Sequence, residues 1–189
     1  MAAAPLSGHR DEIHEFKTGI HPRWCCDDFS AGLAAAQTAG GLPSGASSIK
    51  ETFDDWTVTC LSGEGGKRCA ISQQQQDQQT RQMVLLAEFA PAADGSVNGT
   101  LVLPFGLNLD GGVKLTVDDQ EKGTDARFQT CMPVGCVVPL TLSKDTVAAI
   151  RKGNVLKLGV QAVAGNALNL QVSLKGFSAA LDRSAALLK

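Results

Sequence analysis

The chain has 189 residues, of which 17 are basic and 19 acidic, so its formal net charge is −2. This near balance excludes the clustered basic surface that nucleic-acid binding usually requires. No apolar run reaches the roughly 18 residues of a membrane-spanning helix. All three histidines lie at or before His21, which excludes a histidine-dependent catalytic triad from the rest of the chain.

The first fifty residues differ in texture from the rest. They show neither the period of a strand nor that of a helix, and 33–50 are rich in Ala, Gly, Ser and Pro, which is linker composition. The stretch GLAAAQ resembles the end of a secretory signal peptide cleaved after Ala36, but the apolar core that precedes such a site is missing. We therefore predict a disordered extension over 1–50, either native or carrying the remnant of a signal peptide.

Short runs of alternating apolar and polar residues begin after residue 50. In WTVTC, for example, Trp56, Val58 and Cys60 share one face and two threonines share the other. Such alternation is typical of strands with one face on a core and one in water. The pattern predicts about nine short strands, at 56–60, 67–74, 82–90, 99–103, 113–118, 126–132, 135–142, 154–163 and 168–175.

Turn-forming segments rich in Gly, Pro and Asp separate these runs, so the pattern favours an all-β antiparallel sandwich over a parallel sheet. One helix is predicted in SKDTVAAIRKG, with Ser143 as the N-cap and Gly153 as the stop. FSAALDRSAALLK fits either a second short helix or a frayed end. We therefore expect one domain over 51–182 and a C-terminal tail over 183–189.

The glutamine-rich segment QQQQDQQ, residues 73–79, has two interpretations. It is either a ligand-binding or self-associating tract, or the end of a strand that runs into a solvated loop. We favour the solvated loop because Asp77 and Arg81 interrupt the run.

Four of the six cysteines lie in the domain. Cys60 and Cys69 are separated by eight residues and Cys131 and Cys136 by four, with 61 residues between the two pairs. These intervals fit poorly with the paired knuckles of a zinc site or with the C-x-x-C motif of redox enzymes. Residues that face each other across an antiparallel hairpin are within disulfide range. We predict the disulfides Cys60–Cys69 and Cys131–Cys136, and with them an oxidising compartment.

The segment LPFGLNLDGG is the candidate interaction surface. Exposed at a loop tip, Phe105 and Leu107 would form an apolar anchor for a partner protein. The alternative is that both side chains cap one end of the core. Acidic clusters at 54–55 and 118–121 lack the spacing of a calcium loop, so we expect neither a metal nor a cofactor.

Several motifs in chain order carry a resemblance to a known family. They are W-x-V-x-C at 56–60, CAISQ at 69–73, GTLVLPFGLNLDGGVKL at 99–115, FQTCMPVGC at 128–136 and LKGFSAAL at 174–181. Together they resemble the invasion-associated locus B family of alphaproteobacteria over about 51–182. The resemblance implies an exported protein with an immunoglobulin-like β-sandwich, linked to host-cell invasion or envelope function, and it carries no catalytic residue across.

From these observations we expect a non-enzymatic envelope protein that is periplasmic, outer-membrane-associated or secreted. It would bind a host or envelope protein, take part in invasion and virulence, and associate with membranes at most peripherally. The alternative is a periplasmic carrier or chaperone-like module that binds peptide or lipid along a strand edge or between the sheets. A third hypothesis is an enzyme that uses carboxylates alone.

Overall fold

The computed structural model describes residues 41–189, so most of the predicted extension, with the cleavage site after Ala36, lies outside the described residues. The elements follow in the order η1 (Pro43–Gly45), β1 (Ser48–Phe53), β2 (Trp56–Gly63), β3 (Gly66–Gln76), β4 (Met83–Pro91), β5 (Val97–Leu103), β6 (Val113–Val117), β7 (Thr124–Ala126), β8 (Thr130–Met132), β9 (Gly135–Leu142), α1 (Lys144–Lys152), β10 (Val155–Gln161), β11 (Ala167–Ser173) and α2 (Phe177–Leu188).

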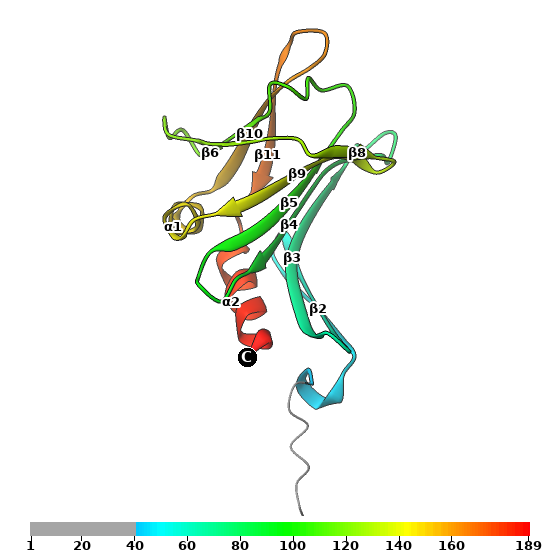
Figure 1. The fold of residues 1–189 in the computed structure, drawn as a ribbon, viewed down its shortest axis with the longest axis vertical. Coiled ribbons are helices and arrows are strands. Elements are labelled where there is room, and N and C mark those ends of the chain that lie inside the picture. Colours follow the sequence, from blue (N-terminus) through cyan, green and yellow to red (C-terminus); the bar gives the residue numbers. More distant parts are fainter. Residues whose placement is uncertain (1–40) are drawn as a thin grey trace, which may run out of the picture. The chain divides into compact units, whose positions relative to one another are not determined.

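The strands form two antiparallel sheets that share one core (Figure 1). One sheet has seven strands in the order β1-β2-β3-β4-β5-β9-β8, and the other has four in the order β11-β10-β6-β7. The predicted all-β, immunoglobulin-like antiparallel sandwich is confirmed at this level of architecture. There are more strands than expected because β1 lies partly in the predicted extension and the predicted run 126–132 is divided between β7 and β8.

Three aromatic rings form the centre of the core. Trp56 of β2, Phe89 of β4 and Phe177 of α2 are almost completely buried, and their ring centroids lie 5.2–5.9 Å apart. The two contacts that Phe177 makes are edge-to-face, the arrangement that the quadrupoles of aromatic rings favour. Aliphatic side chains on alternate positions of the strands surround this cluster.

The C-terminal segment differs from the predicted tail. α2 is a complete helix (Figure 1, red) packed against β2, β3 and β4. Its buried apolar residues are Phe177, Ala180, Leu181 and Leu187. The start of the helix gives little signal in the sequence because its N-cap is Gly176, which has no side chain to make a capping bond. With β1 at the other end, the ordered domain exceeds the predicted 51–182 in both directions.

Helix α1 forms as its capping residues predict. The Ser143 hydroxyl accepts a hydrogen bond from the main-chain N–H of Thr146 at 3.2 Å, and the N–H of Gly153 ends the helix on the carbonyls of Ala149 and Ile150. Ile150 is one of two side chains that the helix buries in the core. Local sequence therefore determines both ends of this element.

The glutamine tract does not become a solvated loop until after β3 ends at Gln76. The side-chain amide of Gln73 donates to the carbonyl of Ser173 and accepts from its N–H, both at 3.0 Å. Two residues further along, Gln75 donates to the carbonyl of Gln171 at 2.7 Å. Alternate glutamines of β3 therefore join the seven-stranded sheet to β11 of the other sheet.

Candidate binding surfaces

Both hairpins carry the disulfides that their cysteines predict. Cys60 faces Cys69 across β2 and β3, and Cys131 faces Cys136 across β8 and β9, with Cα–Cα distances of 4.1 Å and 3.9 Å. The first disulfide is buried, whereas Cys131 is exposed. The second disulfide therefore constrains a surface turn, the segment 132–135.

The structure separates the two residues that were predicted to bind a partner together. Phe105 is 60% exposed, whereas Leu107 is only 5% exposed and pairs with Ala162 in an isolated β-bridge. Gly106 between them has φ +86°, so the chain bends there and the two side chains enter different environments. The prediction for Leu107 is therefore wrong: it caps the core, and only Phe105 is available to a partner.

The hairpin at 132–135 brings further apolar side chains to Phe105. Phe105 and Pro104 line a hollow of about 800 Å³ together with Met83, Pro133 and Val134, and Met132 is exposed beside them. We call these six residues the Phe105 patch. Four of them could not be connected with Phe105 from the sequence, because Met83 and 132–134 are distant from it in the chain and become its neighbours only through strand pairing.

Gly135 fixes the approach of this hairpin to β5. Its φ is +138°, and a Cβ atom there would lie 2.5 Å from the carbonyl oxygen of Leu103. Leu103 directly precedes the loop that carries Phe105, and it pairs with Cys136. A glycine and a disulfide thus hold the two apolar segments of the patch side by side.

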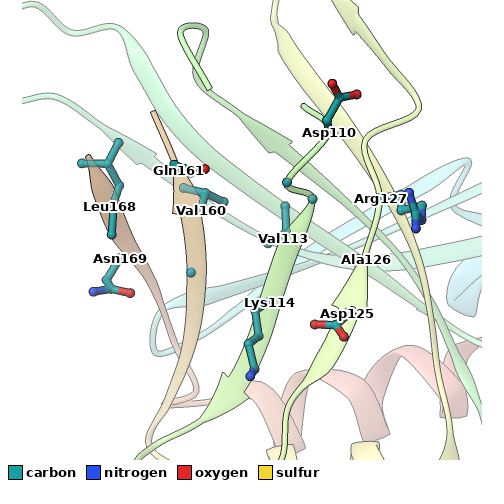
Figure 2. Close-up of a pocket in the computed structure, with 14 residues that line it drawn as sticks. Asp110, Val113, Lys114, Asp125, Ala126, Arg127, Val160, Gln161, Leu168 and Asn169 are labelled. Atoms are coloured by element: carbon teal, nitrogen blue, oxygen red, sulfur yellow. The ribbon is translucent and has the colours of Figure 1, made fainter. Parts of the chain in front are cut away.

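A second hollow, of about 560 Å³, lies over the four-stranded sheet (Figure 2). Strand register places Asn169, Gly159, Lys114 and Asp125 in one row across β11, β10, β6 and β7. Because Gly159 has no side chain, it forms the floor of the hollow between Asn169 and Lys114. The cation of Lys114 and the carboxylate of Asp125 both lie on the β6–β7 side of Gly159. The lining can hydrogen-bond a polar ligand, but it contains no aromatic side chain on which a sugar or base could stack.

The displaced pKa values have local causes. Hydrogen bonds from Arg183 hold the pKa of Glu51 below its usual value, and a bond from Lys157 does the same for Asp119. The pKa of Asp77 is lowered mainly by the main-chain N–H of Thr80. None of these shifts is the upward one that a carboxylic general acid needs.

Metal ligands do not gather in the part of the chain that the structure describes. Among residues 41–189, no three His, Cys, Asp or Glu side chains stand in an arrangement that would hold a metal ion. No helix within the same residues has the length and apolar character needed to cross a membrane.

Comparison with known proteins gives consistent matches. A family model described as "Invasion associated locus B (IalB) protein" matches residues 56–185. The chain is 41% identical over 162 residues to an invasion protein B homolog of Brucella abortus, covering 85% of this chain and 93% of that protein. It is 36% identical over 159 residues to invasion protein B of Bartonella bacilliformis, covering 82% of this chain and 85% of that protein.

A solved structure is similar as well. The crystal structure of invasion associated protein B from Bartonella henselae matches with a TM-score of 0.70 and 37% sequence identity. The match covers 74% of this chain and 96% of that one. The two chains therefore share the fold over nearly the whole of the Bartonella protein.

Proposed function

The chain belongs to the invasion-associated locus B family, and from this premise we propose that it is an exported, non-catalytic binding protein of the bacterial envelope. The observation that carries the proposal is the Phe105 patch. Exposed aromatic and aliphatic side chains that gather in one place usually mark a protein interface, and an aromatic residue often contributes most of the binding energy.

The rigidity of the patch supports this role. Phe105 follows Pro104 and lies two residues before the buried Leu107, while Met132, Pro133 and Val134 lie within a disulfide-closed turn. A surface that is already ordered before it meets a partner loses less conformational entropy on binding. We therefore assign the Phe105 patch to a protein partner on the host cell or in the envelope.

The two disulfides support a location outside the cytoplasm. Disulfides persist in oxidising compartments and are rare where thiols are kept reduced. The protein would act in the periplasm, at the outer membrane or after secretion. The names of the relatives connect them with invasion, and we extend a role in host-cell invasion to this chain as part of the proposal.

A complementation experiment tests the proposal. The gene is deleted in the source bacterium and restored as wild type, as the double variant Phe105→Ser/Val134→Ser, or as Leu61→Ser. Leu61 is a matched control because it is also an exposed apolar residue, at 52%, but lies in β2 outside the patch. Entry into cultured host cells and the amount of folded protein in each cell fraction are measured.

We expect the double variant to reach the same compartment at wild-type level but to restore entry poorly, whereas Leu61→Ser restores it fully. Full restoration by the double variant would overturn the assignment of the patch. Protein confined to the cytoplasm, with free thiols at the four domain cysteines, would overturn the export.

A further inference from the structure

One edge of the four-stranded sheet has unpaired main-chain groups. In β11 the even-numbered residues bond to β10, as the bonds from Ala162 N–H to Asn166 O and from Leu174 N–H to Asn154 O show at either end of the strand. The odd-numbered residues therefore direct their N–H and C=O groups away from the sheet. The bonds of Gln73 to Ser173 confirm this alternation.

Only part of this edge is occupied. Ser173 has both main-chain groups bonded by Gln73, and Gln75 reaches the carbonyl of Gln171. Within residues 41–189, the main-chain groups of Ala167 and Asn169 and the N–H of Gln171 have no hydrogen-bond partner. This free stretch lies where the β10–β11 hairpin extends beyond the body of the domain (Figure 1). β11 is the outermost strand of its sheet, and Figure 2 shows Leu168 and Asn169 on it.

The other outermost strands, β1, β7 and β8, and the half of β9 that β8 leaves uncovered carry features that block pairing, whereas β11 has none. β1 contains Lys50 and Glu51, β7 and β8 have three residues each, and the half of β9 that β8 leaves uncovered contains Pro139. Charges, short strands and proline are the usual protection of an edge against another chain. The sequence of β11, ALNLQVS, has neither a charge nor a proline over seven residues.

We propose that the partner of this edge is β11 of a second copy of the chain, in an antiparallel pair centred on Asn169. A two-fold axis at Asn169 places Asn169 opposite itself and Ala167 opposite Gln171. Every free N–H then meets a carbonyl, and the two four-stranded sheets join into one continuous sheet. The carbonyl of Gln171 keeps its bond to Gln75, since a carbonyl oxygen accepts two hydrogen bonds.

The side chains of β11 match this pairing as well. Leu168 is 40% exposed although it points to the inner face, and the two-fold axis sets it opposite Leu170 of the second copy. Such opposed apolar pairs stabilise neighbouring strands. No like charges meet, because the strand carries none.

The test is the oligomeric state of the protein. Sedimentation equilibrium is measured from about 10 µM to about 1 mM, the range in which weak association becomes visible. We expect the wild type to form dimers as its concentration rises. Asn169→Lys sets two positive charges opposite each other on the axis and should weaken association by about tenfold or more.

Asn98→Lys is the matched control. It makes the same substitution at an exposed position of β5, an inner strand of the other sheet, and should dimerise like the wild type. Thermal unfolding verifies that both variants fold. A wild type that stays monomeric at about 1 mM, or an Asn169→Lys variant that dimerises like the wild type, would overturn the proposal.

Cross-linking gives a second readout. Opposed residues in an antiparallel pair lie within disulfide range. In a chain whose Cys25 and Cys26 are replaced by Ser, Asn169→Cys should therefore yield a covalent dimer on mild oxidation, while Asn98→Cys should not. Equal cross-linking of both variants would also contradict the pairing. Neither measurement depends on the Phe105 patch. The dimer can therefore be disproved while the proposed function stands, and the proposed function can be disproved while the dimer stands.

Discussion

The side-chain amide of Gln73 pairs with the main chain of Ser173 as a neighbouring strand would, donating to its carbonyl and accepting from its N–H at 3.0 Å each. The indole N–H of Trp56 donates to the same carbonyl at 2.9 Å, and the Ser173 hydroxyl donates to Asp55 at 2.6 Å. These contacts join residues about a hundred positions apart. They hold the two sheets together at the point where one sheet ends.

Gln73→Ala should therefore destabilise the domain although it removes little apolar surface. The change leaves the N–H of Ser173 without its partner in a partly buried site, a loss of about 1–3 kcal/mol in the free energy of unfolding. Gln74→Ala is the control, because Gln74 is exposed on the opposite face of β3. Urea unfolding measures the difference, and equal stability of both variants would show that the inter-sheet bond contributes nothing.

Gly176→Ala should be among the most damaging single changes. Gly176 has φ +84°, and a Cβ atom there would collide with the main-chain carbonyl of Phe53, which cannot move as a flexible side chain can. Gly165→Ala is matched to it, since Gly165 has φ +90° but open space around it. We expect a loss of about 1 kcal/mol at Gly165 and a much larger one at Gly176, read from thermal unfolding. Similar losses at both positions would contradict the close approach.

The two disulfides should differ in their effect on stability. Closing these short loops is worth roughly 2–3 kcal/mol each. Cys60 and Cys69 are both buried, whereas in the other pair Cys136 is buried and Cys131 is exposed, so replacing the first pair with Ala leaves the larger cavity. The Cys131→Ala/Cys136→Ala variant should unfold at a higher urea concentration than the Cys60→Ala/Cys69→Ala variant. It should also weaken partner binding, because the turn that carries part of the Phe105 patch is no longer closed. Peptide mapping without reduction checks the pairing first, and free thiols at these positions would contradict it.

Acid should weaken the attachment of α2 to β1. Arg183 of α2 donates two hydrogen bonds to Glu51 of β1, at 2.7 and 2.8 Å, and they hold the pKa of Glu51 below its value in the unfolded chain. Because the pKa of Glu51 is lower in the folded than in the unfolded protein, the ion pair contributes fully to the free energy of unfolding above the unfolded-state pKa. This contribution is lost as the pH falls through the folded-state pKa. The stability difference between wild type and Glu51→Gln should thus shrink between about pH 5 and pH 3.

Glu64→Gln, in the exposed turn between β2 and β3, is the control for the removed charge. The free energy of unfolding of Glu64→Gln should differ little from that of the wild type at every pH. A Glu51→Gln difference that stays constant down to about pH 3 would show that the ion pair does not stabilise the fold.

What the sequence determined by itself is local. Alternation in WTVTC predicts which side chains of β2 are buried, and the turns between the cysteines predict both disulfide pairs. The capping residues Ser143 and Gly153 define α1. In each case the deciding interactions join residues close together in the chain, so composition and spacing contain the information.

The tertiary structure alone decided the rest. Phe105 and Leu107 are both apolar and two residues apart, yet the bend at Gly106 and the bridge to Ala162 expose one and bury the other. Gln73 is polar, but it becomes a buried inter-sheet link because β11 presents an open edge opposite it. The physical reason is the same for Phe105, Leu107 and Gln73. The environment of each side chain is set by strands far away in the chain, and no local pattern reveals the register of those strands.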